Sequence, residues 1–330
     1  MQYGEALNYL DEHASYEKTG RVESPSLDNI NTFMDLMGQP HLSYPVIHIT
    51  GTNGKTTTTR LIAHIVKNNG SRVGFTTSDG IYVQNTLLMK GDTTGPFSAE
   101  FILKDPTVEV AVLETARGGI LRSGLGFSQC DIGVLTNIKE DHLGLNDIHN
   151  LKDLTKVKRV VLDSVKKNGW SVMNADDEYS MRIVNDLHCN VAIFSMDENN
   201  PHIVKFAKEG KITCVYEEGF VTIKKGDWKI RVEKATHIPL TFNGSVGFMI
   251  QNVLAATLTT FLWGCKTEDI KMSLETFVPS AAHTPGRMNV FKFKDFKILV
   301  DFAHNPDGFN GIKDYLATVD ATEHVGVISG

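Results

Sequence analysis

The chain has 330 residues, of which 41% are hydrophobic and 22% charged, and its formal net charge is −6. These values are typical of a soluble globular protein of one or two domains, and we expect neither a nucleic acid nor a membrane as partner. The 4 cysteines are scattered without a CxxC pair, and the first residues lack the basic and apolar regions of a signal peptide, so we expect a cytoplasmic protein.

The first 45 residues have the pattern of two short helices. Apolar side chains recur at helical spacing in 6–17 and in 27–37, and a break between Gly20 and Pro25 separates the two segments. Pro40 and Pro45 then precede the first strand-like run. We therefore expect residues 1–45 to form a helical N-terminal arm.

The stretch VIHITGTNGKTTTT at 46–59 predicts a buried strand, a glycine turn and the start of a helix. Such a turn gathers backbone N–H groups around an anion, Lys55 adds a positive charge, and the Thr56 hydroxyl suits Mg²⁺. The spacing is GxxGK[ST] instead of GxxxxGK[ST], because Ile49 stands where the longer pattern has its first glycine. We expect a site for ATP or GTP formed by Gly51, Thr52, Asn53, Gly54, Lys55, Thr56 and Thr57.

Between residue 46 and about residue 195, near-continuous apolar runs of strand length alternate with helical segments. Because such runs leave no polar face, they indicate an α/β fold with a mostly parallel sheet that is flanked by helices on both sides. The runs after the first strand are 72–78, 108–116, 131–138, 170–176 and 190–196.

The hydrophobic pattern of the sequence changes in residues 211–240. Three short runs with turns at Gly219 and Gly226 predict a small antiparallel sheet, and helices are expected at about 249–263 and 267–276. We place the central nucleotide-binding domain at 46–284.

The last part of the chain, 285–330, follows a linker-like segment and predicts a hairpin, a helix at about 308–317 and a strand at 324–329. These elements bury too little surface to be stable alone. We therefore expect the beginning of a truncated C-terminal domain.

Glu114 ends the apolar run at 108–116 and precedes the glycine-rich stretch ARGGILRSGLG. In open α/β sheets ligands bind at the C-terminal ends of the strands, so a carboxylate beside a phosphate loop is a natural Mg²⁺ ligand. Arg117 and Arg122 are suited to neutralise anions. A solvated glutamate at a strand end is the alternative interpretation.

Two further segments carry candidate ligands. Asp141 and His142 follow the run at 131–138, and an imidazole near a glutamate suits a second Mg²⁺ or Mn²⁺, although such a histidine is often a hydrogen-bonded structural residue. Lys156 and Lys158 occur in a helical pattern with apolar neighbours. Taken alone, this pattern indicates a solvated lysine face.

Arg287, Asp301, His304 and Asn305 lie close together in sequence around the expected domain junction. Junctions between domains are preferred ligand sites, and arginine suits a phosphate clamp. A charged linker would have the same composition.

Together, these segments resemble the Mur ligase superfamily of ATP-dependent amide ligases along the whole chain. The segments SDGIYVQ, KGDTTGP, ETARGGILR, TNIKEDHLG, NADDE and DFAHNPDG resemble the Mur-ligase-like half of cyanophycin synthetases, and ETARGGILR is the most specific of them. The N-terminal arm looks like that of folylpolyglutamate synthases instead. The resemblance implies a Rossmann-like fold for the C-terminal domain.

The resemblance also implies a role for several residues in metal binding. Thr56 and Glu114 would hold one Mg²⁺, and His142 would hold a second one together with Lys158. Lys158 aligns with a lysine that is carbamylated in many members, a modification that would turn the ammonium into an anionic oxygen ligand.

For the nucleotide, the resemblance implies that Lys55 contacts the β- and γ-phosphates, Arg287 the γ-phosphate and Asn252 the adenine. Asp301 matches an aspartate associated with the ribose and the domain linker. The residue before Asn252 is Gln251, where many members have histidine. The residues expected to carry catalysis are therefore Lys55, Glu114, His142, Lys158 and Arg287.

The implied activity is an ADP-forming ligation through an acyl phosphate, which joins an amino acid to a small-molecule or peptide carboxylate acceptor. A cyanophycin-like acceptor is expected first and a folate or other polyglutamyl acceptor second. We expect neither the ATP-grasp half of cyanophycin synthetases nor the uridine-nucleotide domain of cell-wall ligases, because no segment of the 330 residues resembles them. A nucleotide hydrolase or a nucleotide-binding module of another class is the alternative, and the sequence leaves a homo-oligomer open.

Overall fold

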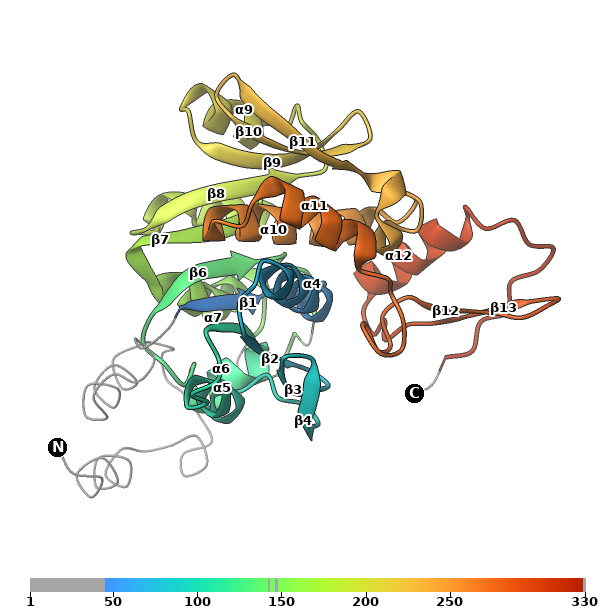
Figure 1. Ribbon diagram of the computed structural model, residues 1–330, viewed down its shortest axis with the longest axis horizontal. Helices are drawn as coiled ribbons and strands as arrows, with labels where there is room; N and C mark the ends of the chain where they lie inside the picture. The colour runs from blue at the N-terminus through green and yellow to red at the C-terminus, as the bar shows by residue number, and fades with distance from the viewer. Residues whose placement is uncertain (1–44, 142, 146–147, 329–330) are drawn as a thin grey trace.

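The computed structural model describes residues 45–141, 143–145 and 148–328, and its centre is one sheet of eleven strands. Strand β1 lies in the middle of this sheet (Figure 1). In spatial order the strands are β11 (Trp228–Lys234), β10 (Phe220–Lys225), β9 (Ile212–Glu217), β8 (Asn190–Ser195), β7 (Val165–Asn174), β6 (Cys130–Leu135), β1 (Val46–Thr50), β5 (Val110–Glu114), β2 (Val73–Thr77), β3 (Gly80–Val83) and β4 (Thr86–Lys90).

The strands from β2 across to β9 pair in parallel, as the near-continuous apolar runs predict. All five residues of β1 and of β5 are buried, because helices cover both faces of the sheet. The expected α/β fold with a mostly parallel, helix-flanked sheet is thus confirmed. The parallel strands place their C-terminal ends, including Thr50 and Glu114, at one edge of the sheet.

Antiparallel strands extend the sheet at both sides. Strands β9, β10 and β11 form where three strands were predicted. Strand β10 pairs antiparallel with both β9 and β11, and β9 pairs in parallel with β8, so the three strands continue the large sheet. The hairpin of β3 and β4 was not predicted from the sequence. Its turn residues Gln84 and Asn85 both have positive φ, which identifies the tight hairpin turn that asparagine favours.

Helices form a layer on each face of the sheet. They are α4 (Lys55–Asn68), α5 (Pro96–Leu103), α6 (Arg117–Ser123), α7 (Leu151–Asp163), α8 (Glu178–Arg182), α9 (Pro201–Lys208), α10 (Gly247–Trp263) and α11 (Thr267–Thr276). Helices α4, α10 and α11 share one apolar cluster with the strands, and α5, α6, α7 and α9 share a second cluster on the other face. Ile47 and Ile49 of β1 belong to the first cluster and Val46 to the second, as strand geometry requires.

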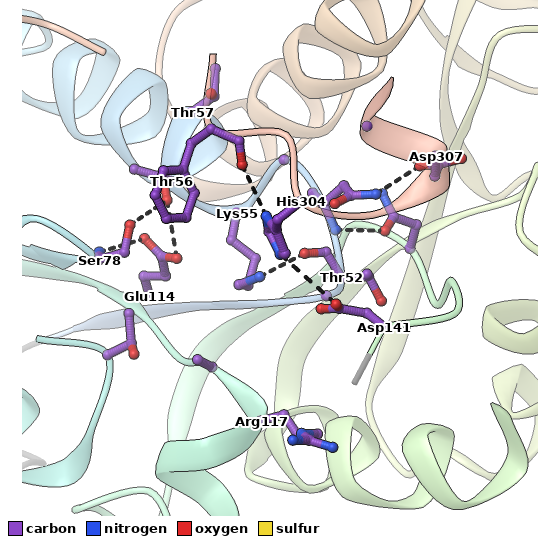
Figure 2. A pocket seen from close by; sticks show the side chains of 18 of the residues that line it. Thr52, Lys55, Thr56, Thr57, Ser78, Glu114, Arg117, Asp141, His304 and Asp307 are labelled. Carbon is purple, nitrogen blue, oxygen red and sulfur yellow. Dashed lines mark hydrogen bonds and ion pairs between the residues drawn. The ribbon is translucent and has the colours of Figure 1, made fainter. Parts of the chain in front are cut away.

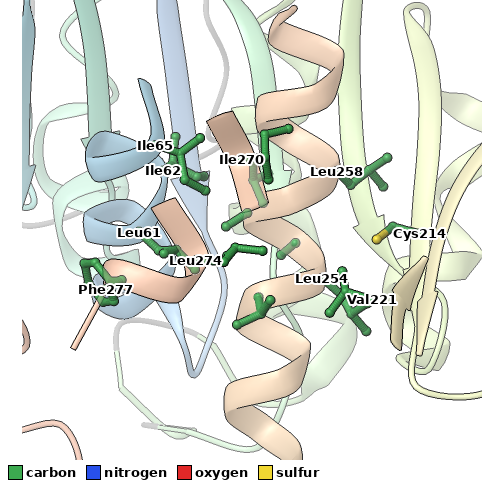
Figure 3. Packing of buried hydrophobic residues seen from close by; sticks show 14 of the residues in the cluster. Leu61, Ile62, Ile65, Cys214, Val221, Leu254, Leu258, Ile270, Leu274 and Phe277 are labelled. Carbon is green, nitrogen blue, oxygen red and sulfur yellow. The ribbon is translucent and has the colours of Figure 1, made fainter. Parts of the chain in front are cut away.

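Helix α10 lies at the centre of the first cluster, where Leu254 and Leu258 face buried side chains of the sheet (Figure 3). Leu254 is fully buried. We expect Leu254→Ala to lower the free energy of unfolding by about 2–5 kcal/mol, because it removes buried methyl groups and leaves a cavity. Chemical denaturation measures this loss, and Met272→Ala on the exposed side of α11 is the matched control, expected to stay within about 0.5 kcal/mol. Equal losses in the two variants would contradict this account of the core.

The C-terminal segment forms a two-stranded sheet of β12 (Asn289–Lys292) and β13 (Lys297–Val300), followed by α12 (Pro306–Leu316). Helix α12 packs against the main body, where the Tyr315 ring lies 5.2 Å from that of Phe242. The expected strand at 324–329 does not form within the described residues 324–328. Val325 and Val327 in this segment are exposed. A strand needs a neighbour, and no described strand pairs with these residues.

The expected helical arm lies outside the described residues, except for Pro45. Among the described residues, every helix is too short or too polar to cross a membrane.

Candidate active site

The phosphate loop connects β1 to α4 in the predicted strand–turn–helix arrangement. Gly54 precedes the helix in the left-handed region, with φ 82°, and Gly51 has φ 147°. A Cβ atom at Gly51 would collide with the Thr136 hydroxyl, and one at Gly54 would collide with the Asn252 side chain. Only glycine therefore fits at these two positions.

Hydrogen bonds from β6 and the loop after it hold the phosphate loop in place. The Asn53 amide N–H donates to Asn137 Oδ1 over 2.9 Å, and the Thr136 hydroxyl donates to the Asn53 carbonyl over 2.6 Å. The Thr52 hydroxyl exchanges hydrogen bonds with the backbone of Lys139. The loop is thereby fixed before any ligand arrives, as a preorganised phosphate site requires.

Lys55 begins α4 and extends back over its own loop. Its Nζ donates to the Thr52 carbonyl over 2.8 Å. Desolvation in the cavity lowers the pKa of Lys55, and the carboxylates of Glu114 and Asp141 oppose this shift. The two carboxylates therefore favour the charged form, which is the form that binds phosphate.

Glu114 lies at the C-terminal end of β5, where its side chain is buried beside the first turn of α4. The Thr56 hydroxyl donates to Glu114 Oε1 over 3.1 Å, and the Ser78 amide N–H donates to Oε2 over 3.2 Å (Figure 2). Burial raises the pKa of Glu114, and Lys55 opposes this rise. The solvated alternative for Glu114 is wrong, since only 3% of the residue is exposed.

The oxygen donors at Thr56 and Glu114 fit a divalent cation. A carboxylate and a hydroxyl are hard ligands of the kind that Mg²⁺ and Mn²⁺ prefer, and these two meet beside the first turn of α4. A buried carboxylate with a raised pKa also gains from a nearby positive charge. Among the described residues there is no cluster of three or more His, Cys, Asp or Glu side chains that would hold a metal without further ligands.

Lys158 is buried on α7, so the interpretation of a solvated lysine face is wrong for this residue, although it holds for the exposed Lys156. Lys158 Nζ donates to the Thr52 hydroxyl over 3.1 Å. Burial, together with the charge of Lys55, lowers the pKa of Lys158 well below its ordinary range. His142, the expected partner of Lys158 in metal binding, lies outside the described residues.

Residues from α10 and from the C-terminal segment form the opposite side of the site. Asn252 on α10 is buried and accepts a hydrogen bond from the Thr58 hydroxyl over 3.4 Å. Arg287 stacks on Phe302 with 5.0 Å between guanidinium and ring centroid. Asp301 accepts from the Met288 amide N–H over 2.8 Å, and burial raises its pKa.

Direct contacts join the phosphate loop to the start of α12. Asn53 Nδ2 donates to Asp307 Oδ2 over 2.7 Å, and Asn305 Nδ2 donates to Asn53 Oδ1 over 3.0 Å. His304 Nε2 lies 3.8 Å from Asp141 Oδ1. The segment after residue 285 is therefore part of the site in this structure and does not form a separate charged linker.

Most of the side chains named above line one cavity of about 530 Å³ (Figure 2). The predicted site residues that line it are Gly51, Thr52, Asn53, Gly54, Lys55, Thr56, Thr57, Glu114, Lys158, Asn252, Arg287 and Asp301. The structure thus brings together all the described residues that were expected to bind ATP or a metal ion or to carry catalysis. Their individual roles stay predictions.

The cavity also contains residues to which the sequence analysis gave no role. These are chiefly Ser78, Asp92, Thr94, Asp307 and Phe248. Ser78 was detectable in principle, because it directly follows β2, whose C-terminal end lies at the same sheet edge as Glu114. For Asp307 the sequence gives only a weak indication of a place in the site, namely an acidic residue in the first turn of α12.

A family model described as the Mur ligase middle domain matches residues 49–260. Cyanophycin synthetase of Geminocystis herdmanii is 48% identical to this chain over 286 residues, which are 87% of this chain and 33% of that protein. The chain therefore spans about a third of the length of the cyanophycin synthetases that it matches.

Two solved structures show the same fold. The structure of UDP-N-acetylmuramoyl-L-alanyl-D-glutamate–2,6-diaminopimelate ligase is similar with a TM-score of 0.65 and 20% identity, covering 88% of this chain and 57% of that one. A bifunctional folylpolyglutamate synthase/dihydrofolate synthase, with Mn, AMPPNP and L-glutamate bound, has a TM-score of 0.63 and 18% identity. Its match covers 95% of this chain and 74% of the other.

Proposed function

The chain belongs to the Mur ligase family, and from this premise we propose that it carries the ATP site of an ADP-forming amide ligase. One observation supports this proposal above all others. A phosphate loop places Thr56 within 3.1 Å of the buried Glu114 carboxylate, in a cavity that Lys158 and Arg287 also line. Groups suited to bind a phosphate, a metal ion and an acceptor carboxylate therefore line the same cavity.

The nucleotide would extend from the phosphate loop along α10. Backbone N–H groups at the start of α4 and the Lys55 ammonium would bind the β- and γ-phosphates, and Arg287 would face the γ-phosphate from the C-terminal segment. Asn252, which lies beside Gly54, would contact the adenine, and Asp301 would contact the ribose. We further propose a boundary at 284/285 between a central domain and a C-terminal domain, with residues 1–45 as an arm.

Thr56 and Glu114 would hold Mg²⁺ or Mn²⁺, which when bound neutralises phosphate charge and polarises the phosphoryl oxygens. We propose that His142 and a carbamylated Lys158 hold a second ion. The lowered pKa of Lys158 supports carbamylation, since the neutral amine is the form that reacts with CO₂. The bound Mn and AMPPNP of the folylpolyglutamate synthase/dihydrofolate synthase structure agree with this choice of cofactors.

The proposed reaction has two steps. A carboxylate oxygen of the acceptor attacks the γ-phosphorus of ATP, the bond to ADP breaks, and an acyl phosphate forms. The amine of an amino acid then attacks the acyl carbon, phosphate leaves, and the nitrogen loses a proton. Lys55 and Arg287 would stabilise the charge on the transferred phosphoryl group, which is catalysis by positioning and electrostatics without a protein nucleophile.

For the acceptor, we propose first a cyanophycin-like peptide that is extended by an amino acid. The 48% identity to cyanophycin synthetase supports a cyanophycin-like acceptor over the acceptor of a less similar relative. A folate or other polyglutamyl acceptor is the second candidate, and the likeness of fold to folylpolyglutamate synthase/dihydrofolate synthase supports it.

The test is phosphate release from ATP and Mg²⁺ by the protein in its full natural length, with a panel of amino acids crossed with β-Asp-Arg peptides and folates. We expect release only when one acceptor and one amino acid are both present. Release that is indifferent to both would instead show a nucleotide hydrolase. Tight ATP binding without turnover under any combination would show a binding module.

A further inference from the structure

The turn between β2 and β3 carries a buried ion pair next to the candidate metal site. This two-residue turn consists of Ser78 and Asp79. Ser78 faces the site, where its amide N–H donates to the Glu114 carboxylate (Figure 2). Asp79 instead accepts a hydrogen bond from the guanidinium of Arg60 on α4. Neighbouring residues of one turn thus connect the site to a charged pair outside the cavity.

Three side chains hold the Asp79 carboxylate. Besides Arg60, the Tyr82 hydroxyl donates to Oδ2 over 2.6 Å and the Thr77 hydroxyl donates to Oδ1 over 2.8 Å. The loop after β4 is attached to the same turn, because the Gly91 amide N–H donates to the Asp79 carbonyl over 3.1 Å. The position of the turn therefore depends on Asp79.

Arg60 is packed against two aromatic rings. Only 5% of its side chain is exposed. Its guanidinium lies 4.6 Å from the ring centroid of Tyr82 and 5.6 Å from that of Phe75. The two rings are stacked, with 4.7 Å between their centroids. Because a guanidinium is attracted to the face of an aromatic ring, this packing holds the Arg60 charge beside Asp79.

Stability alone accounts poorly for this ion pair. Burial of two charges costs solvation free energy that their attraction offsets only in part, so such a pair often adds little to stability. In addition, the buried Nε of Arg60 has no hydrogen-bond partner among the residues that the structure describes. An unpaired buried N–H group is unfavourable. What the pair does provide is a fixed connection between α4 and the turn.

This connection runs parallel to a contact within the site. Arg60 follows Thr56 by four residues on α4, so the two share one face of the helix. The Thr56 hydroxyl donates to Glu114 and lies 3.1 Å from the Ser78 hydroxyl oxygen. The ion pair therefore joins the helix to the turn one helical turn beyond the site. A shift of the turn would move Ser78 and change its hydrogen bond to Glu114.

We propose that the Arg60–Asp79 pair positions a ligand of the divalent cation. The pair holds the turn in place, and Ser78 in that turn then orients the Glu114 carboxylate. This inference rests on the proposed function, because it presupposes a metal ion at Glu114. Neither Arg60 nor Asp79 lines the cavity, so both act as positioning residues. Removal of a group that orients a metal ligand typically weakens metal binding by about 10–100-fold.

The charge of Arg60 separates this role from two simpler ones. If Arg60 acted only through its charge, its removal would strengthen the binding of a cation, because like charges repel. If it only stabilised the fold, its removal would lower stability and leave the affinity for the metal ion unchanged. A positioning role predicts weaker metal binding, which neither of the simpler roles does.

The experiment measures Mn²⁺ binding by electron paramagnetic resonance in the protein of full natural length, saturated with AMPPCP. The Mn²⁺ binding that Glu114→Gln removes defines the site. We expect Arg60→Met to raise the Kd of Mn²⁺ at this site about tenfold. The Kd of AMPPCP without a metal ion should stay unchanged. In turnover, the variant should need about tenfold more Mn²⁺ and then reach the same kcat.

A double variant tests the proposal even if an unpaired Asp79 carboxylate prevents folding. Arg60→Met combined with Asp79→Asn leaves no unpaired charge and keeps the net charge of the protein. We expect the same rise of about tenfold in the Kd of Mn²⁺, since both changes break one contact. A pure effect of charge predicts no change in this variant.

Lys166→Met is the matched control. It removes a partly buried cation whose Nζ lies 2.8 Å from Asp131 Oδ1. Lys166 lies at the start of β7, and the site lies at the opposite edge of the sheet, where the parallel strands end. This variant should therefore lose stability and keep the unmodified Kd of Mn²⁺.

Two results would overturn this inference alone, provided that Glu114→Gln still removes the site. They are a Kd of Mn²⁺ that stays the same or falls in the folded Arg60 variants, and a rise of equal size in Lys166→Met. Unchanged Mn²⁺ binding in Glu114→Gln would overturn the proposed metal site and, with it, this inference.

Discussion

Replacing Lys55 with alanine is expected to lower acceptor-dependent phosphate release by about 10²–10³-fold, the range found when one preorganised electrostatic contact is removed from an active site. Lys55 is the positive side chain at the start of α4, with its Nζ 2.8 Å from the Thr52 carbonyl of the phosphate loop. Loss of its ammonium leaves the γ-phosphate without this contact both in the bound state and in the transition state. The Kd of AMPPCP should therefore rise together with the fall in turnover.

The control is Lys67→Ala, which removes a lysine from the last turn of the same helix, outside the cavity. This variant should keep its turnover, and both variants should unfold at nearly the same denaturant concentration as the unmodified protein. Unchanged turnover in folded Lys55→Ala would refute the assignment of the phosphate loop.

Much of the central sheet was predictable, because its strands are buried on both faces. The apolar runs that contain β1, β5 and β6 are near-continuous, and such runs identify parallel strands between helices. The ends of these strands then locate Glu114 and the phosphate loop at one sheet edge. Residues that follow directly on a strand were expected to lie close together, and they do, since the fold itself brings such positions to one sheet edge. Their roles stay predictions.

Lys158 shows where the interpretation of a pattern failed. Leu154 lies four residues before Lys158 and Val161 three residues after it, so all three share the buried face of α7. Lys156 lies on the other side of the helix and is exposed. The helical spacing alone places Lys158 on the buried face of α7. The prediction of a solvated side chain followed from the residue type, because lysines are usually exposed, and it did not use this position.

Other features depend on contacts between distant segments. The hydrogen bonds of Asn53 to Asn305 and Asp307 join residues more than 250 positions apart, and no local pattern predicts such a pairing. The turn at Gln84 and Asn85 lacks the glycine that marks most tight hairpins. Both features follow from how the segments pack in the folded chain.

Replacing Lys158 with alanine is expected to lower turnover by about 10²-fold, and added acetate is expected to restore part of it. Lys158 is buried beside Thr52, and a carbamate on its Nζ would supply an anionic oxygen ligand for the proposed second metal ion. In the alanine variant, acetate has room to occupy the vacated space and to supply the missing oxygen. Phosphate release against acetate concentration measures this rescue, which should saturate.

Lys156→Ala is the matched control, because it removes a lysine from the exposed side of the same helix. We expect full turnover from this variant and no effect of acetate on it, since acetate has no missing ligand to replace. Full activity of Lys158→Ala without acetate would remove Lys158 from the site. A deep loss that acetate fails to relieve, with stability retained, would show that Lys158 acts as an amine through its hydrogen bond to Thr52 and that carbamylation has no part in the reaction.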